Sequence, residues 1–350
     1  MFPRVLTARA LNRALLARQL LLDRSSHSLV RALERVGGLQ TQYAPSAYVA
    51  LWSRLSGFRR DQLTGALTSR RAVQGTLMRS TIHIVSKADY ALFAAGVGPT
   101  RREWWLRTNR PQGLDRTHYE QAASIVRAEL SNGPRQRDEL IAALAQAGVP
   151  KEAWAGAGIY VEMVRVPPSG TWEQRRADLF GLADDWLGPT VVSESEGLAH
   201  LCRRYLGGFG PATLSNISSW SGVPVTTIRP IVEAMTLRRF RSEQDEELLD
   251  LPRGPLPDPE RRAPVRFLPT WDATLLVHAR RTLILPEEYR SLVFHTKNPQ
   301  SVPTFLVDGQ VAGTWKHQDG KIVLAPYAPL PRSVSRELED EATGLAALHA

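Results

Sequence analysis

Glycine and proline divide the middle of the chain into a module that occurs twice. Each copy contains two such breaks, with helical patterns on either side of them, because glycine favours the end of one helix and proline the start of the next. The breaks lie at Asn132-Gly133-Pro134, Gly148-Val149-Pro150, Gly210-Pro211 and Gly222-Val223-Pro224. A segment typical of a β-hairpin closes each copy, at residues 171–183 and 237–252. Three helices followed by a hairpin form a winged helix, so the repeat predicts tandem winged-helix domains.

The first hundred residues follow the same plan less regularly. Amphipathic and alternating patterns predict four helices and then a strand or hairpin, at residues 7–23, 28–36, 46–55, 60–70 and 72–86. Gly37 and Gly38 are expected to end the second helix in a left-handed conformation, and Ser46 to cap the third. This part therefore favours a third winged helix.

The C-terminal part has a different character. Residues 251–269 are rich in proline and predict a linker. Residues 270–285 and 304–327 are interpreted as strands, and Asp308-Gly309 and Asp319-Gly320 are strong hairpin turns. We expect a small β-rich cap over residues 266–330, packed against the helical domains.

These patterns predict a mainly α fold with β-hairpins, of the α+β class. Its tandem winged-helix domains carry a small β-rich C-terminal region. The expected division is 1–112, 113–192 and 193–255 for the three winged helices, and 256–350 for the C-terminal region.

The charge of the chain favours a polyanionic partner. Lys and Arg number 44 against 35 Asp and Glu, a formal net charge of +9, and arginine dominates. The excess is concentrated between residues 59 and 110. The basic residues there are Arg59, Arg60, Arg70, Arg71, Arg79, Lys87, Arg101, Arg102, Arg107 and Arg110, against Asp61, Asp89 and Glu103. This stretch fits a nucleic-acid surface or a merely solvated basic face, and its composition does not separate the two.

Several classes of protein are disfavoured by composition. No apolar run approaches the roughly 20 residues that a membrane-spanning helix needs. Arg13 and Arg18 interrupt the apolar pattern at the start, which a signal peptide would not tolerate, so we expect a cytoplasmic protein. A single cysteine, Cys202, and scattered histidines argue against an internal disulfide and against a metal centre, and no cofactor motif is present.

Gln40 and Gln42 stand one residue apart in the segment "GGLQTQYAPSAY". Such a pair after two glycines is usually a solvated turn. As chemistry, an amide donates and accepts hydrogen bonds but takes no proton near neutral pH. Two amides could therefore hold a water molecule without acting as a strong general base, which suits a reaction whose leaving group departs easily.

Two further polar groups are candidates. If residues 76–85 form one strand, Arg79, Thr81 and His83 share a face and could contact phosphate or a modified base; a structural role fits equally well. The segment "FLPTWDATLLVHARR" offers Asp272, His278, Arg280 and Arg281, although the aspartate could simply cap a turn. Neither a Ser/His/Asp triad nor a phosphate-binding glycine loop stands out.

Four segments resemble a known family. They are "RALLARQLLLDR", "LQTQYAPSAYVALWSRL", "GTLMRSTIHIVS" and "FLPTWDATLLVHARR". In this order they resemble the winged-helix DNA glycosylases of the AlkZ type, whose bacterial relatives include YcaQ. The resemblance spans nearly the whole chain. In AlkZ-like members a Gln-x-Gln motif is catalytic, whereas the YcaQ-like branch has Gln-x-Asp. Thr41 departs from the usual apolar middle residue, which bears on packing more than on chemistry.

The resemblance implies an activity that agrees with the amide chemistry. Family members hydrolyse the N-glycosidic bond of alkylated purines in double-stranded DNA, chiefly N7-alkylguanine, and some unhook interstrand crosslinks. Such a base already carries a positive charge and leaves as a neutral molecule. The enzyme then needs a positioned water and lone pairs near the sugar cation, which Gln40 and Gln42 could supply.

The resemblance also implies a set of DNA-binding residues. The winged helices would form an open cradle, and a hairpin of the last domain would lie near the lesion; "FHTKNPQSVPTF", with His295 and Lys297, is the candidate hairpin, or else a surface loop. The residues expected at DNA or substrate are Thr41, Tyr43, Arg79, Thr81, His83, Trp271, Asp272, Arg281, His295 and Lys297.

Two functions remain open from the sequence. The first is a monofunctional DNA glycosylase, because the motif lacks an amine placed for Schiff-base chemistry. It would serve repair or self-resistance to a genotoxic natural product, without metal or cofactor, and as a monomer. The second is a non-catalytic winged-helix DNA-binding regulator.

Overall fold

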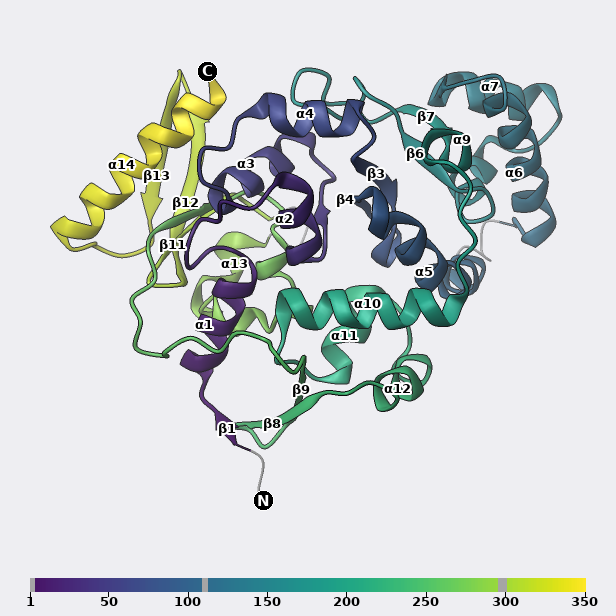
Figure 1. The fold of residues 1–350 in the computed structure, drawn as a ribbon. Coiled ribbons are helices and arrows are strands. Elements are labelled where there is room, and N and C mark those ends of the chain that lie inside the picture. The colour runs from purple at the N-terminus through teal and green to yellow at the C-terminus, as the bar shows by residue number, and fades with distance from the viewer. Residues whose placement is uncertain (1–3, 109–112, 295–300) are drawn as a thin grey trace.

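The computed structural model describes residues 4–108, 113–294 and 301–350 (Figure 1). Its helices are α1 Ala8–Arg18, α2 Leu29–Val36, α3 Ala44–Arg54, α4 Arg60–Thr68, α5 Lys87–Thr108, α6 Arg116–Leu130, α7 Arg137–Gln146, α8 Trp154–Ala157, α9 Ala183–Leu187, α10 Glu194–Phe209, α11 Leu214–Ser221, α12 Val225–Glu233, α13 Arg290–Val293 and α14 Arg332–His349. Its strands are β1 Val5–Leu6, β2 Leu39–Gln40, β3 Ala72–Thr76, β4 Ile82–Ser86, β5 Arg135–Gln136, β6 Met163–Arg165, β7 Leu179–Leu182, β8 Arg238–Ser242, β9 Glu247–Asp250, β10 Arg266–Leu268, β11 Thr304–Val307, β12 Gln310–Gln318 and β13 Lys321–Pro326.

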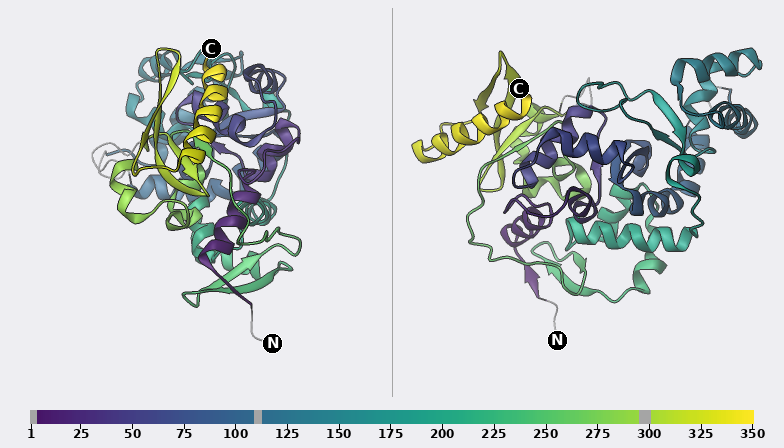
Figure 2. Two further views of the ribbon diagram at one scale, coloured as in Figure 1. Left: turned by 90° about the vertical axis from the view of Figure 1, so that its left-hand side faces the viewer. Right: turned by 45° about the horizontal axis from the view of Figure 1, so that its top comes forward.

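The β-hairpins of the winged helices pair with strands from other parts of the chain. One sheet has the order β2-β4-β3-β6-β7-β5, so the hairpins β3-β4 and β6-β7 are continuous with one another. The hairpin β8-β9 takes up the N-terminal strand β1 in parallel. The strands β10 to β13 form a separate antiparallel sheet. The C-terminal sheet with α14 and the pair α6 and α7 lie at opposite ends of the molecule (Figures 1 and 2).

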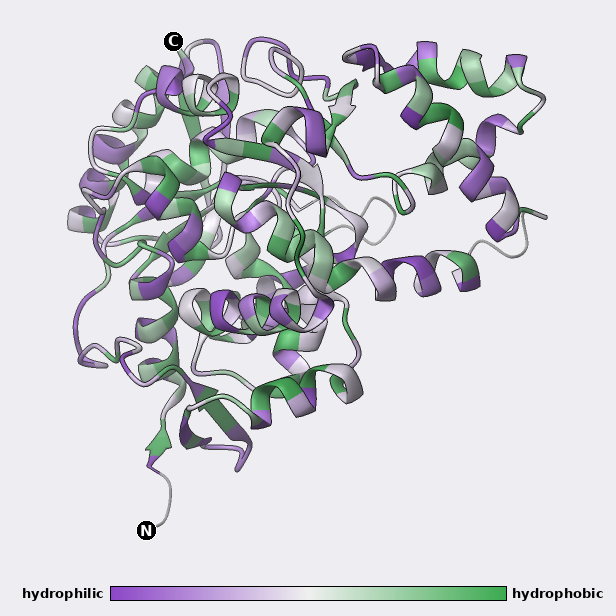
Figure 3. Cartoon of the chain, turned by 45° about the vertical axis from the view of Figure 1, so that its right-hand side comes forward, coloured by the Kyte–Doolittle hydropathy of each residue, from purple (hydrophilic) through white to green (hydrophobic). Residues whose placement is uncertain are grey.

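Two glycines let α5 and α10 cross at close range. A Cβ atom on Gly96 would lie 2.8 Å from the carbonyl carbon of Gly197, and one on Gly197 would lie 2.5 Å from the nitrogen of Gly96. Only glycine therefore fits at this crossing. Helix α10 carries both hydrophobic and hydrophilic residues (Figure 3), as a helix with one buried face does, and Leu198, Leu201 and Tyr205 are among its buried residues.

Two of the apolar cores among the described residues join elements that are distant in the sequence. The larger core joins α5, α10 and α11 through Phe93, Tyr205 and Trp220. The second joins α3 to the C-terminal sheet and to α14, through residues such as Phe267 and Leu345. The C-terminal region is thus packed directly against the N-terminal helices that carry the Gln-x-Gln motif.

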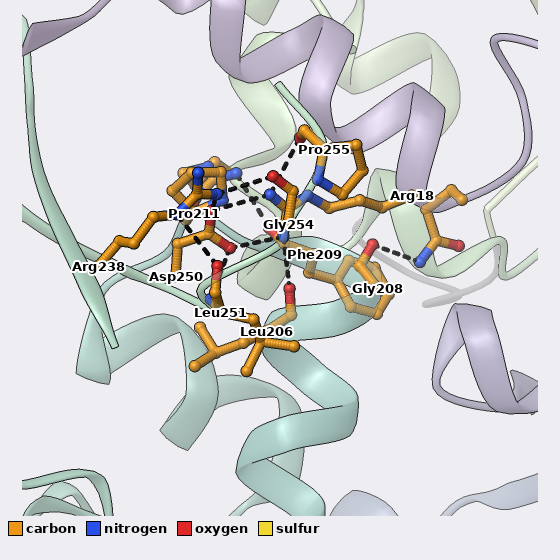
Figure 4. Close-up of polar contacts among 12 residues, drawn as sticks. Arg18, Leu206, Gly208, Phe209, Pro211, Arg238, Asp250, Leu251, Gly254 and Pro255 are labelled. Atoms are coloured by element: carbon orange, nitrogen blue, oxygen red, sulfur yellow. Dashed lines mark hydrogen bonds and ion pairs between the residues drawn. The ribbon is translucent and has the colours of Figure 1, made fainter. Parts of the chain in front are cut away.

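A buried ion pair joins the N-terminal helix to the third hairpin (Figure 4). The guanidinium of Arg18, on α1, donates to both carboxylate oxygens of Asp250, on β9, at 2.7 and 3.0 Å. It also donates to the carbonyl of Leu206 at 2.8 Å, and Arg238 binds the same carboxylate. Neither Arg18 nor Asp250 has an exposed side chain. The pair therefore fixes β9 relative to α1 and to the end of α10.

The predicted fold class is confirmed, with helices and a hairpin in each winged-helix unit. The breaks around 132–134, 148–150, 210–211 and 222–224 all separate helices, and both Asp-Gly turns connect strands. The division into four domains stays a prediction, because the first two units share one sheet.

Several local predictions were wrong. The first helix ends at Arg18, and Leu20 takes a left-handed φ of 57°. Helix α3 begins at Ala44 with Pro45 in its first turn, so Ser46 lies inside the helix and does not cap it. In the hairpin predicted at 171–183, only β7 is a strand; its partner β6 lies earlier in the chain.

Larger errors concern the C-terminal half and α5. Residues 270–285 were expected to form strands but form short 3-10 helices. The long helices α5 and α14 were not predicted. Helix α5 contains Pro99 and two glycines, which are typical of loops. Helix α14 has a helix-forming composition but follows a proline-rich stretch.

Candidate active site

The Gln-x-Gln motif lies where helix α2 turns into the sheet. Gly37 and Gly38 have φ angles of 79° and 82°, which reverse the chain after Val36. Gln40 then pairs with His83 of β4, and the Thr41 amide donates to the Ile82 carbonyl at 2.8 Å. Helix α3 begins two residues after Gln42. The motif therefore lies between the end of α2 and the start of α3, and its first glutamine belongs to the short strand β2.

A chain of hydrogen bonds connects Arg79, Gln40 and Gln42. The Arg79 guanidinium donates to Oε1 of Gln40 at 2.6 Å, and Nε2 of Gln40 donates to Oε1 of Gln42 at 2.9 Å. Gln40 is buried, whereas Gln42 is exposed. Because a carbonyl oxygen has two lone pairs, Oε1 of Gln42 can still accept a second hydrogen bond from a molecule outside the turn.

Arg79 occupies an unusual place in the hairpin. It lies on a 3-10 turn, Met78–Ser80, with a left-handed φ of 51°, a conformation that is uncommon outside glycine. Its other guanidinium nitrogen donates to the carbonyl of Trp220, on α11. Burial lowers the pKa of Arg79 to about 10. The single strand expected over 76–85 is wrong, because this turn separates β3 from β4.

His83 and Thr81 make hydrogen bonds to the backbone and do not face solvent freely. Nδ1 of His83 lies 3.0 Å from the Thr81 carbonyl, and Oγ1 of Thr81 donates to the Met78 carbonyl at 3.0 Å. Burial, followed by the charge of Arg79, lowers the pKa of His83 to about 3. The ring is therefore neutral at physiological pH, and it cannot serve as a general acid there. Burial likewise lowers the pKa of His278, followed by the charges of Arg79 and His83.

The side chain of Asp272 is buried and makes contacts within the protein. Its carboxylate pairs with Arg54 of α3, with an N to O distance of 2.9 Å and both side chains 1% exposed. It also accepts from the Thr274 backbone nitrogen at 3.1 Å and so caps a 3-10 helix, Ala273–Leu275. A carboxylate that is buried in an ion pair is not placed to contact DNA, so the structure does not favour the expected substrate role.

Of the other residues predicted to bind DNA, Thr41 and Tyr43 are sequence neighbours of the glutamine pair, whereas Trp271 and Arg281 belong to the C-terminal region. Tyr43 follows Gln42, is 44% exposed, and receives a hydrogen bond of 3.0 Å from Arg175. Thr41 is buried within the turn. Trp271 donates its backbone amide to Ser301, and Arg281 lies over the ring of Phe294. His295 and Lys297 lie outside the described residues.

The basic stretch from Arg59 to Arg110 is divided between structure and surface. Arg101 is buried and donates to the carbonyls of Thr76 and Gly158. Arg60 and Arg70 lie over tryptophan rings. Arg110 falls outside the described residues. Only part of the stretch is therefore available for phosphates.

Sequence reasoning missed a second basic surface. A groove of about 730 Å³ lies between α2, α10 and the segment after β9. Its cationic lining residues are Arg31, Arg35, Arg203, Arg204 and Arg253. They come from three separate segments, and only the i and i+4 spacing of Arg31 and Arg35 could have indicated a common face.

Neither a membrane span nor a metal site is found in the described parts of the chain. None of the helices there is long and apolar enough to cross a membrane. Residues 4–108, 113–294 and 301–350 contain no group of three or more His, Cys, Asp or Glu side chains that could hold a metal ion.

Comparison with known proteins decides the family. A family profile described as "DNA glycosylase AlkZ-like" matches residues 33–348. The chain belongs to the AlkZ-like DNA glycosylase family. It is therefore a monofunctional DNA glycosylase, and the resemblance drawn from the four sequence segments is confirmed. The alternative of a non-catalytic regulator is set aside.

Individual AlkZ-like relatives are distant in sequence but share the fold. The chain is 22% identical over 362 residues to an "Interstrand DNA cross-link repair glycosylase" of Streptomyces sahachiroi, covering 94% of this chain and 93% of the relative. The structure of the Streptomyces sahachiroi DNA glycosylase AlkZ aligns with a TM-score of 0.84 and 19% identity, covering 99% of this chain and 98% of that one. At this identity the structural match supports the tandem winged-helix architecture.

Proposed function

We propose that this glycosylase hydrolyses the N-glycosidic bond of N7-alkylated guanine in double-stranded DNA. The observation that carries the proposal is the hydrogen-bond chain from Arg79 through Gln40 to Gln42. It leaves a carbonyl lone pair of Gln42 at the exposed end and places no ionised acid or base there. Such a site can orient a water molecule, but it cannot protonate a leaving group.

An N7-alkylated purine suits this site because it needs no acid. The alkyl group gives the base a permanent positive charge, so the base leaves as a neutral molecule once the C1′–N9 bond breaks. The sugar acquires the positive charge of an oxocarbenium ion. The oxygen of Gln42 is placed to accept a hydrogen bond from the attacking water, whose own lone pair then faces that cation.

The two glutamines have different tasks in this mechanism. Oε1 of Gln40 is occupied by Arg79, and its amide hydrogen is directed to Gln42. Gln40 therefore orients Gln42, and Gln42 holds the water. The proton of the water passes to solvent as the C1′–O bond forms, because neither the neutral His83 nor an amide accepts it.

Larger adducts and crosslinks are included in the proposal. The relative from Streptomyces sahachiroi is described as a cross-link repair glycosylase. The motif of this chain is exposed at Gln42, so a duplex carrying a bulky adduct can approach it without entering a closed pocket. Tyr43, Trp271 and Arg281 keep the proposed role of DNA contacts. We propose that the enzyme acts in the cytoplasm as a monomer, in repair or in self-resistance.

The deciding experiment measures abasic sites. Purified protein is incubated with duplexes that carry one N7-methylguanine, one bulky N7 adduct or one N7 crosslink, and strand cleavage after mild alkali reports each released base. We expect release from all three and little release by the Gln42→Ala variant. Inactivity of the wild type on every duplex, with the protein folded and bound to DNA, would overturn the proposal.

A further inference from the structure

The groove between α2, α10 and the segment after β9 is rich in arginine. Its volume is about 730 Å³, and it is partly open to solvent. Among the described residues that line it, five are arginines and one is a carboxylate, Glu34. A guanidinium group presents its donors as a planar fork that matches two phosphate oxygens at once. We call this feature the arginine groove.

The carboxylates near the arginine groove are already paired. Glu34 accepts a hydrogen bond of 3.1 Å from Arg31 and lies 3.7 Å from Arg204. The buried Asp89 pairs with the same Arg204 at 2.8 Å and with His200 at 2.7 Å. Both negative charges are therefore neutralised by cations that the fold supplies, and neither is left for another arginine.

Three further arginines of the groove have no such partner. They are Arg35 on α2, Arg203 on α10 and Arg253 after β9, and all three are exposed. None forms an ion pair with a carboxylate in the described ranges 4–108, 113–294 and 301–350. Like charges that surround one groove repel each other, and an anion placed between them relieves this repulsion. The groove is thus complementary to a ligand that carries several negative charges.

The wall that carries Arg253 is rigid. Arg238 donates to the Leu251 carbonyl at 3.1 Å and to the Gly254 carbonyl at 2.7 Å, on either side of Arg253 (Figure 4). The same guanidinium binds the carboxylate of the buried ion pair on β9. Because this segment is held before any ligand arrives, little ordering is lost on binding.

The arginine groove lies close to the Gln-x-Gln motif. Gly37 ends α2, and a Cβ atom on it would lie 3.7 Å from the carbonyl oxygen of Arg204, which lines the groove. Gln40 follows three residues later, so its Cα atom is at most about 11 Å from that of Gly37. Each strand of a duplex carries one phosphate per about 3.4 Å of axis, so this distance corresponds to about three base pairs. One duplex is therefore long enough to contact both.

We propose that the arginine groove binds the phosphate backbone of double-stranded DNA, on damaged and undamaged duplexes alike. DNA is the polyanion that a member of a DNA glycosylase family meets, and the groove offers it three unpaired arginines on fixed elements. Contacts to phosphates carry no sequence information. The groove therefore holds the enzyme on the duplex independently of which base is released at Gln42.

Cross-linking tests whether DNA lies in the groove. Gly207 of α10 lines it, and a Cβ atom there would meet only the Leu251 side chain, at an ordinary 3.8 Å. The chain has a single cysteine, Cys202, which is buried and whose pKa burial raises to about 12, so it does not react at neutral pH. Gly207→Cys thus adds one reactive thiol.

The duplex for this experiment is undamaged and carries a short thiol tether, activated as a disulfide, on one backbone phosphate. We expect Gly207→Cys to form a disulfide with this DNA. Ser333→Cys is the matched control, because Ser333 is exposed on α14, outside the groove. It should not cross-link. Failure of Gly207→Cys to cross-link, or equal cross-linking by both variants, would overturn the proposal.

Charge removal tests whether the arginines bind phosphate. The groove variant carries Arg35→Gln, Arg203→Gln and Arg253→Gln. Fluorescence anisotropy on an undamaged duplex should show about tenfold weaker binding or more at moderate salt. The slope of log affinity against log salt concentration should fall in magnitude by about one per arginine. The thermal midpoint should stay equal or rise, because like-charge repulsion is relieved.

A second variant controls for net charge. It carries Arg127→Gln, Arg332→Gln and Arg336→Gln, three exposed arginines of α6 and α14 that likewise lack an ion pair within the described parts of the chain. Its affinity and salt slope should stay close to those of the wild type. Equal losses in both variants would assign the effect to net charge, and no loss in the groove variant would favour an acidic protein as the partner; either result would overturn the proposal. Since the duplex is undamaged, a failure of base release leaves this test intact.

Discussion

Arg79 donates a 2.6 Å hydrogen bond to Oε1 of Gln40, and this bond determines the orientation of both amides of the motif. With its oxygen held by Arg79, Gln40 must present its NH₂ group to Gln42, which in turn presents an oxygen. The arginine reaches this position only because the hairpin between β3 and β4 turns through a left-handed residue. The polarity of the site is thus set by a residue 39 positions away from the first glutamine.

The variant Gln40→Glu distinguishes a role of Gln40 in orienting Gln42 from a role in binding DNA. A glutamate keeps the contact with Arg79 and gains an ionic component, but it has no hydrogen to donate to Gln42. We expect the single-turnover rate to fall about 10-fold to 100-fold through lost orientation, while DNA affinity changes little. Gln42→Glu is the partner variant: its carboxylate can still accept from Gln40, so it should lose less activity than Gln42→Ala. Equal rates for wild type and Gln40→Glu would refute the positioning role.

Arg79→Met tests the other end of the hydrogen-bond chain that runs from Arg79 through Gln40 to Gln42. The variant removes a buried cation that has no carboxylate partner among the described residues, so the loss of its two hydrogen bonds is offset by relief from desolvation. We expect a small change in thermal midpoint together with a rate loss like that of Gln40→Glu. A double variant with both Arg79→Met and Gln40→Glu should be no slower than either single variant, because Arg79, Gln40 and Gln42 act as a unit. Additive losses in a double-mutant cycle would contradict this.

Much of the fold was readable from local signals. Glycine and proline breaks, together with Asp-Gly turns, encode their own geometry, so the helices of the second and third units and the C-terminal hairpin could be predicted. The segment 270–285 could not be predicted, because its apolar residues belong to short 3-10 helices that pack against α1 and α11. Tertiary packing there overrides local propensity.

The residues of the candidate site could be predicted from the sequence, but their arrangement could not. Gln40, Gln42 and Arg79 were all singled out, but the assumed strand placed Arg79, Thr81 and His83 on one surface. The structure instead directs Arg79 inward to Gln40 and Trp220, and buries His83. A left-handed arginine has no sequence signature, since the conformation is imposed by the surrounding hairpin and helix α11.

The enzymatic acceleration of base release should not depend on pH between about 6 and 9. Burial places the pKa of His83 at about 3 and that of Arg79 at about 10, so neither group changes its charge in this interval. The charge at N7 of the alkylated base is fixed, but its N1 proton is acidic and ionises near neutral pH, so the single-turnover rate is divided at each pH by the spontaneous depurination rate of the same duplex. This ratio, measured under saturating enzyme, should give a flat profile. A bell-shaped profile of the ratio would show that an acid or base of the protein takes part.

The stability of the protein should fall as the pH drops below about 6.5. The pKa of His83 is 6.5 as a free side chain and about 3 in the folded protein, so the unfolded chain binds more protons between these values. The stabilisation is complete above pH 6.5 and is lost progressively as the pH falls toward 3. Thermal midpoints should show this decline. His83→Phe should reduce the slope of this decline and leave the part that comes from His278 and His349, whose pKa values burial also lowers. The exposed His27→Gln should not change the slope.

Asp272→Asn tests whether this residue acts in structure or in substrate binding. The substitution leaves Arg54 buried at 1% exposure without its carboxylate partner. Breaking a buried ion pair from one side costs about 3–5 kcal/mol, so denaturant unfolding should show a large loss of stability. At a temperature where the variant remains folded, its half-saturating concentration on N7-methylguanine duplex should match that of the wild type. Asp61→Asn is the control, because Asp61 pairs with Arg59 at the surface and its loss should leave the unfolding curve unchanged. A folded Asp272→Asn variant with normal stability and weakened substrate binding would instead restore the DNA-contacting role expected from the sequence.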